Sequence, residues 1–112
     1  MSLGVSISNQ QEADEKIPIL LEIPAAVRFV SAEPILSAVD LRPWLADLGW
    51  LIVGTESGSR RRPAELDWLL DLKNQAVAAC VPLFVKSAEI DGKVVNMPEL
   101  DCVVWNQFPR RR

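Results

Sequence analysis

Residues 48–63, LGWLIVGTESGSRRRP, carry the strongest indication of the fold. The apolar run WLIV at 50–53 lies between two glycines, which is typical of a short buried strand. A small polar loop follows, and Pro63 suits the first residue of a helix. Strand, glycine-rich loop and helix form a βα unit, whose loop lies at the carboxyl end of the strand. That end is where α/β folds bind their ligands.

The rest of the chain repeats this alternation of strand and helix. The predicted strands are residues 3–8, 27–31, 50–54 and 82–86, and the predicted main helix is residues 64–79. Parallel strands with right-handed crossovers are the default. We therefore predict an α/β fold, a partial (β/α) barrel of about four parallel βα units with a C-terminal extension. Residues 1–112 are expected to form a single domain, the C-terminal half of a barrel that typically needs roughly 250 residues.

Local signals predict where the first helices begin and end. Asn9 followed by Glu12 is typical of a capping box, so a helix is expected to start there. Pro18 is expected to kink this helix or to end it near residue 16, because proline removes a backbone hydrogen bond. Asp40 is predicted to cap a second, short helix that ends at Gly49.

The carboxyl-terminal half has one amphipathic pattern and one turn signal. Five apolar residues of the main helix are expected to share its buried face: Leu66, Leu69, Leu70, Val77 and Cys80. Asp91-Gly92 between apolar residues predicts a hairpin turn. Residues 98–109 are expected to pack as a closing segment.

Composition excludes several classes of protein. The chain is 49% apolar, has a mean hydropathy of +0.13 and carries a net charge of −3, so nucleic acid is not favoured as a partner. No apolar stretch reaches the roughly 18 residues that a membrane helix needs. Histidine is absent, which argues against Ser/His/Asp and Cys/His catalysis within this chain. Cys80 and Cys102 form neither a disulfide framework nor a metal motif, and we expect buried free thiols and no metal site.

Charged residues follow three predicted strands at their carboxyl ends. Glu33 follows the second strand, Glu56 the third, and Lys86 the fourth. In a barrel both carboxylates would point into one mouth, where they could bind an amino group or act as an acid–base pair. Alternatively, each carboxylate caps a loop amide or pairs with an arginine. Lys86 either contacts a ligand or pairs with one of the two glutamates, because an isolated charge is costly to bury.

The loop at residues 54–58, GTESG, admits two interpretations. Its backbone N–H groups could cradle an anion near a helix start, which adds Gly54 and Ser57 to the candidate ligand residues. The alternative is a tight turn in which glycine serves only to allow a positive φ. The full phosphate-loop pattern with its lysine is absent.

Two arginine triplets hold six of the 12 cationic residues. Arg60, Arg61 and Arg62 could contact phosphates of a nucleic acid or meet a protein partner, or they form a solvated loop. The triplet at 110–112 is expected to be a terminal tail.

Many short motifs, in order, resemble a bacteriophage-associated family of unknown function that is described as carrying a three-cysteine motif. The matching pieces are LGVS at 3–6, NQ at 9–10, AD at 13–14, IP at 17–18, PA at 24–25, RF at 28–29, SxEPIL at 31–36, VGxESG at 53–58, RP at 62–63, Lys86, and WNxFP at 105–109. The resemblance covers nearly the whole chain. It departs from the family at Thr55 and near Cys102, where the family more usually has glycine.

The resemblance implies a radical-SAM-like (β/α) barrel whose amino-terminal half holds an iron–sulfur cluster on closely spaced cysteines. This chain resembles only the carboxyl-terminal portion, and its cysteines, Cys80 and Cys102, are 22 positions apart. The iron–sulfur cluster, S-adenosylmethionine and any catalysis are therefore implied for a longer parent protein, and the fragment alone is expected to hold no cofactor and to be inactive. The resemblance further implies a phage or prophage-type protein in the cytoplasm of a bacterium or infected cell. The alternative is a non-catalytic domain that binds protein or nucleic acid through Arg60–Arg62.

A half barrel also predicts self-association. The first and fourth strands would be sheet edges, and the apolar face that the missing half covers would be bare. We therefore expect a homo-oligomer formed through an exposed edge or through that face.

Overall fold

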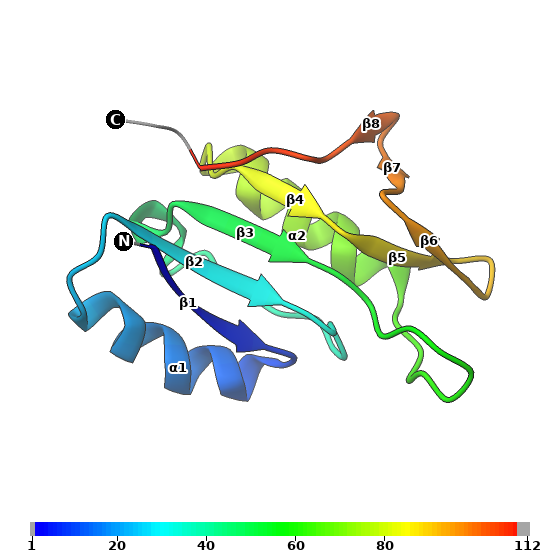
Figure 1. Cartoon of the computed structure of the whole chain (residues 1–112), viewed down its shortest axis with the longest axis horizontal. Coiled ribbons are helices and arrows are strands. Elements are labelled where there is room, and N and C mark those ends of the chain that lie inside the picture. Colours follow the sequence, from blue (N-terminus) through cyan, green and yellow to red (C-terminus); the bar gives the residue numbers. More distant parts are fainter. Residues whose placement is uncertain (1, 110–112) are drawn as a thin grey trace.

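A four-stranded parallel sheet is the centre of the molecule (Figure 1). The computed structural model describes residues 2–109. The strands are β1 (Ser2–Ile7), β2 (Val27–Ala32), β3 (Trp50–Val53) and β4 (Leu83–Val85), and their order in the sheet follows the chain. The parallel pairing confirms the α/β prediction. A strand order of this kind is compatible with part of a (β/α) barrel and does not by itself establish one.

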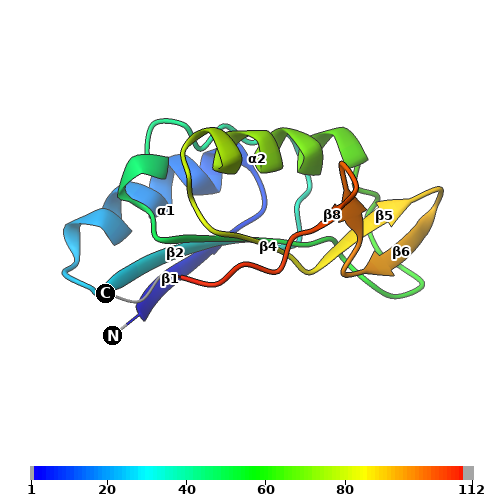
Figure 2. The ribbon, with the colours of Figure 1, turned by 90° about the horizontal axis from the view of Figure 1, so that it is seen from above.

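Both α-helices lie on the same face of this sheet (Figure 2). Helix α1 (Gln10–Glu22) connects β1 to β2, and α2 (Leu66–Ala78) connects β3 to β4. The core fills the space between the helices and the sheet. Its fully buried members on the strands include Ile7, Val30, Leu51 and Leu83, and those on the helices include Ile17, Leu20, Leu69 and Leu72. Within residues 2–109 no helix is long and apolar enough to cross a membrane.

The start of α1 confirms the predicted cap, and of the two predicted effects of Pro18 the end of the helix near residue 16 is wrong. The Asn9 side chain accepts a hydrogen bond from the Glu12 N–H at 2.9 Å, and the Glu12 carboxylate accepts one from the Ser8 N–H at 2.7 Å. The helix then runs through Pro18 to Glu22 without ending near residue 16. Pro18 is exposed, so water can reach the backbone carbonyl that its ring leaves without a helical partner.

The connection from β2 to β3 is irregular, and the predicted helix is reduced to the 3-10 turn η1 (Leu45–Asp47). Backbone groups of this connection form hydrogen bonds with a side chain of α2. Gln75, which is 2% exposed on α2, accepts from the Leu41 N–H at 2.8 Å and donates to the Val39 carbonyl at 2.9 Å. One buried side chain thus holds this connection against the helix, and these backbone groups cannot serve a helix of their own.

The predicted buried face of α2 is wrong in part. The residues that this helix buries are Leu69, Leu72, Lys73, Gln75 and Ala76. Val77 is half exposed and Cys80 lies beyond the helix. Leucines at 66, 69, 70 and 72 offer two overlapping stripes, and packing on the sheet selects the stripe through Leu72 and Ala76.

The prediction of buried thiols is also wrong. Cys80 and Cys102 are both exposed. Each has a positive φ, at 58° and 64°, so each occupies a turn and not the apolar run beside it.

The C-terminal extension consists of two hairpins and a return segment. Strands β5 (Ser87–Ile90) and β6 (Lys93–Asn96) are antiparallel and are joined by Asp91-Gly92 with φ values of 52° and 76°, which confirms the predicted turn. Strands β7 (Glu99–Leu100) and β8 (Val103–Val104) form the second hairpin. The chain then runs back along β4 with an antiparallel bridge between Phe84 and Asn106.

This return segment corrects the expectation that both outer strands are free edges. The Val85 N–H donates to the Trp105 carbonyl at 2.8 Å, and the Gln107 N–H donates to the Leu83 carbonyl at 2.9 Å. The outer edge of β4 is therefore paired. At the other edge, the Lys16 ammonium donates to the Ser6 carbonyl of β1 at 2.9 Å and occupies part of that edge.

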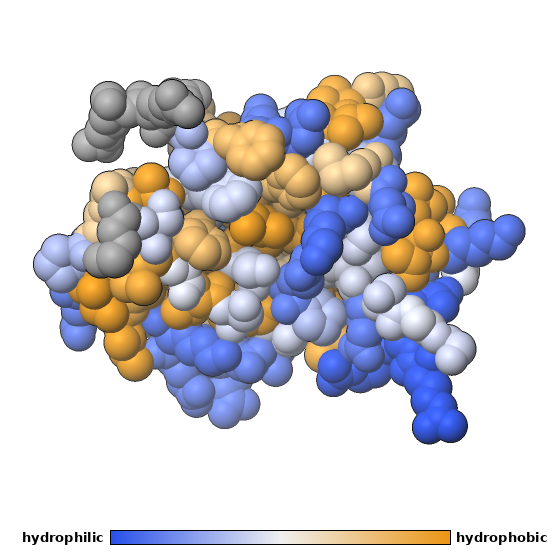
Figure 3. All heavy atoms as spheres, in the orientation of Figure 1, coloured by the Kyte–Doolittle hydropathy of each residue, from blue (hydrophilic) through white to orange (hydrophobic). Residues whose placement is uncertain are grey.

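The face of the sheet opposite the helices carries aromatic side chains, and we call it the open face. It includes Phe29 on β2, Trp50 on β3 and Phe84 on β4, and Phe108 from the return segment lies against the last two. Figure 3 looks on to this face. Phe108 is 64% exposed and Phe29, Trp50 and Phe84 are only half-buried, so within residues 2–109 no second layer covers this side.

Candidate functional site

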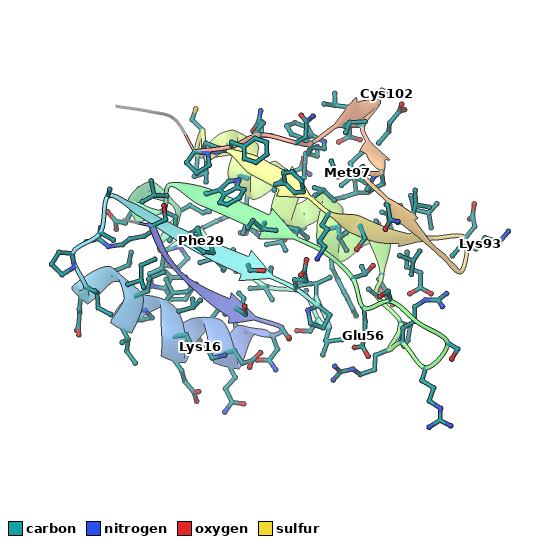
Figure 4. The ribbon with its side chains drawn as sticks, viewed as in Figure 1. Lys16, Phe29, Glu56, Lys93, Met97 and Cys102 are labelled. Atoms are coloured by element: carbon teal, nitrogen blue, oxygen red, sulfur yellow. The ribbon has the colours of Figure 1, made fainter. Side chains whose placement is uncertain are left out.

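The carboxyl ends of β2, β3 and β4 surround a pocket of about 230 Å³. Glu33 follows β2, the loop with Glu56 and Ser57 follows β3, and Lys86 follows β4. The lining residues are Glu33, Pro34, Thr55, Glu56, Ser57, Lys86, Ser87, Val94 and Asn96. Four of the five ligand candidates chosen from the sequence therefore line one pocket, and Figure 4 labels one of them, Glu56.

Gly54, the fifth candidate, lies beneath the Glu33 side chain. A Cβ atom at Gly54 would lie 2.7 Å from Glu33 Oε2, which is closer than such contacts allow. The positive φ of this loop belongs to Gly58, at 101°. The tight-turn interpretation thus holds for Gly58, whereas Gly54 permits a close approach of side chain to backbone.

Glu33 and Lys86 form an ion pair across β3. Glu33 Oε1 lies 3.3 Å from Lys86 Nζ, and the side chains are 29% and 64% exposed. Because β3 lies between their two strands, the pair has to span its end, and Gly54 leaves the room for it. Pairing with a glutamate was one of the two roles expected for Lys86.

Glu33 keeps one unused acceptor. Its Oε2 atom is shielded from solvent and has no hydrogen-bond partner among residues 2–109. Leaving a shielded polar atom unpaired costs roughly 1–3 kcal/mol. A donor group on a ligand would relieve that cost after a small rotation of the side chain.

Glu56 pairs with Arg62, as the alternative interpretation of its role allowed. Glu56 Oε2 lies 2.8 Å from Arg62 Nε, and the arginine side chain is 62% exposed. Ion pairs this exposed contribute only about 0–1 kcal/mol. Arg62 and Lys86 are 62% and 64% exposed, so a ligand can replace either cation at its glutamate.

The loop after β3 is fastened to the β5–β6 hairpin, which makes the opposite wall of the pocket. Thr55 and Ser87 are both buried; the Thr55 N–H donates to Ser87 Oγ at 3.1 Å, and Ser87 Oγ donates to the Thr55 carbonyl at 3.3 Å. Arg61 donates to the Gly92 carbonyl at 2.6 Å and lies 3.8 Å from Glu89. Both walls are therefore held in place by contacts within the chain itself.

These contacts also change the interpretation of the arginine triplet. Arg61 and Arg62 are engaged with the hairpin and with Glu56, and Arg60 is exposed. The triplet is not a uniform cationic patch. The second triplet, at 110–112, lies outside the described residues.

Sequence reasoning missed the residues that the extension supplies. Ser87, Val94 and Asn96 line the pocket from β5 and β6. Ser87 directly follows Lys86, so its position next to a strand end was a usable signal. Val94 and Asn96 reach the pocket only because the hairpin folds back over the sheet end, and no local pattern encodes that.

A second, apolar pocket of about 320 Å³ adjoins the first on the open face. It is lined by Ser31, Glu33, Trp50, Ile52, Phe84, Lys86 and Phe108. Glu33 and Lys86 belong to both pockets, so the ion pair separates a polar compartment from an aromatic one.

The chain belongs to a family of proteins of unknown function, DUF5131, whose model matches residues 1–109. Comparison with curated proteins and with solved structures finds no match. The family description assigns no activity, so the phage-type and radical-SAM-like resemblance stays a prediction.

Proposed function

We propose that this domain binds a small charged ligand at the carboxyl ends of β2, β3 and β4. One observation carries the proposal: two glutamates and a lysine from three neighbouring strand ends line a single preformed pocket. Strand carboxyl ends are the usual ligand site of α/β folds. The charges come from residues 33, 56 and 86, which only the fold brings together.

The chemistry of the pocket favours a ligand that carries an amino group. Glu33 offers the unpaired Oε2, and Glu56 is held only by an exposed arginine. Lys86 and Arg62 could then turn to a carboxylate or phosphate on the same molecule. A zwitterionic ligand would leave the balance of two acids and two bases unchanged.

Substitution of Glu56 tests this proposal. Glu56→Gln keeps the shape of the side chain, so we expect a melting temperature within a few degrees of wild type and the loss of ligand binding. The assay is a thermal-shift and NMR screen of amines, amino acids and carboxylic acids against both proteins. Glu99→Gln, at an exposed position away from the pocket, is the matched control. A large loss of stability with binding retained would show that Glu56 is structural.

We further propose, following the resemblance, that the domain is part of a phage-type, radical-SAM-like (β/α) barrel in a longer parent protein. A parallel sheet with helices on one face and a site at the strand ends supports this. Residues 2–109 contain no group of three His, Cys, Asp or Glu side chains that could hold a metal ion, and the two cysteines are separate exposed residues. An iron–sulfur cluster does not fit these residues, so its ligands would have to come from elsewhere in the parent.

The parent protein provides the test of that second proposal. Anaerobic purification from the complete natural gene, followed by visible absorption and iron analysis, should show bound iron with sulfide charge-transfer bands. An iron-free, colourless and folded protein would contradict the radical-SAM relationship and leave the ligand site of the domain still to be tested by the screen.

A further inference from the structure

The open face is an unusual surface for a monomeric protein. All-parallel sheets are found almost only where both faces are covered. Here the helices cover one face, and the other presents Phe29, Trp50, Ile52, Phe84 and Phe108 at its surface. Exposed apolar patches of this kind mark interaction sites.

Side chains of the open face are arranged in rows across β2, β3 and β4. In the row nearest the amino ends of the strands, Phe29 pairs with Trp50. The next row toward the carboxyl ends holds Ser31, Ile52 and Phe84. Because alternate residues share a face, the following row holds Glu33, Gly54 and Lys86. That row therefore has an acid on one side of β3, no side chain on β3 and a base on the other side.

We propose that two copies of this 112-residue chain, by itself, pack open face to open face about a two-fold axis that runs along β3. In a longer parent barrel the same face would line the interior, so this proposal concerns the chain without a further barrel half. Such a rotation places β2 of each copy opposite β4 of the other and stacks the two β3 strands on each other. Glu33 of each copy then faces Lys86 of the other, and the two Ile52 side chains meet on the axis. Two sheets packed in this way would be aligned and about 10 Å apart.

The surface favours a second copy over other occupants because it is complementary to itself. An isologous interface requires that each residue find its complement in the same patch. A row with acid on β2 and base on β4 satisfies that requirement, whereas a face of one sign would repel its copy. Lys86 is 64% exposed in this 3.3 Å ion pair, so it can leave the Glu33 of its own chain for the Glu33 of the other copy.

The sheet edges offer a weaker route to assembly. The outer edge of β4 is paired with the return segment, and Lys16 occupies the Ser6 carbonyl on β1. A side chain from a neighbouring helix that covers part of an edge strand hinders strand pairing at that point. Of the two routes predicted from the sequence, the structure thus favours the apolar face over the edge.

This arrangement has a consequence for the ligand pocket. Glu33 and Lys86 line the pocket as well as the open face. In the dimer, Lys86 of the partner subunit would lie beside Glu33, so each pocket would be completed by a residue from the other copy.

Charge reversal tests the proposal. We expect light scattering across a concentration series to show a dimer for the wild-type chain. Lys86→Glu and Glu33→Lys should each raise the dimer dissociation constant at least about 10-fold, because each places like charges opposite each other twice. A mixture of the two variants should dimerise about as well as wild type, since acid again faces base in the mixed pair. Glu99→Lys, away from the face, is the control.

Circular dichroism should show that each variant is folded before its mass is interpreted. A wild-type monomer at every concentration would overturn the proposal, and uptake of an apolar dye by that monomer would assign the face to another occupant. A dimer that neither reversal weakens, or two variants that fail to combine, would also overturn it.

Discussion

Replacement of Gln75 by leucine should destabilise the fold strongly although the two side chains are similar in size. Gln75 is 2% exposed and is hydrogen-bonded to the Leu41 N–H and the Val39 carbonyl, both on buried residues. Leaving a buried backbone group unpaired costs about 1–3 kcal/mol, so losing both bonds costs about 2–6 kcal/mol. The added apolar surface returns about 1–2 kcal/mol. At the middle of both ranges the expected net loss is about 2–3 kcal/mol, a large fraction of a typical total stability of about 5–15 kcal/mol.

Urea unfolding followed by circular dichroism measures this loss directly, with equal slopes required for the comparison. The melting temperature should fall by about 4–8 °C for each kcal/mol. Gln11→Leu is the control, because Gln11 is exposed on α1 and, within residues 2–109, its side chain bonds only to Glu15 of the same helix, at 3.3 Å. A loss below about 0.5 kcal/mol would refute the reasoning, since it would mean that the β2–β3 connection does not depend on α2.

Three further substitutions test local features of the fold by the same unfolding assay. The Ser8 N–H, and secondarily Lys16, hold the pKa of Glu12 below its ordinary value. The stabilisation by ionised Glu12 is fully present above the ordinary pKa of glutamate and is lost as the pH falls through the lowered pKa of the folded state. Glu12→Gln should therefore lower the free energy of unfolding at neutral pH and leave it unchanged in acid. Pro18→Ala should stabilise α1 by about 1–3 kcal/mol, because Pro18 lies inside the helix; a loss would imply that its ring packs against the fold. Gly92→Ala should cost about 1–2 kcal/mol, because φ is 76° there, and an unchanged midpoint would contradict a strained turn.

Local sequence signals predicted those elements that depend on neighbours in the chain. The capping box at Asn9 and Glu12, the Asp91-Gly92 turn and the four parallel strands all appear where expected. The cap and the turn depend on residues only a few positions apart, and each strand was located from the apolar run of its own residues. The positions of these elements can therefore be predicted without knowledge of the fold.

Features that depend on distant partners were predicted poorly. The sequence could not show that Gln75 would occupy the backbone near Val39, and a helix was predicted there. Lys73 is another example, since it is buried on α2 beside Asp101 of the second hairpin. From the sequence alone, a lysine on a helix is expected to be exposed to solvent, and only its partner Asp101 explains its burial. The same limit explains why the return segment along β4 was not foreseen.

For the candidate site, the sequence predicted which residues take part, and only the fold shows which of them lie next to each other. A charge after a strand is a local signal, and Glu33, Glu56 and Lys86 were found by it. Their pairing is not local, because Glu33 and Lys86 are separated by β3 and meet only across Gly54. A side chain at Gly54 would push the Glu33 carboxylate away from Lys86 while leaving the strand itself intact. Gly54 is thus better understood as a feature of the site than of the turn, because its lack of a side chain makes room for the Glu33 carboxylate beside Lys86.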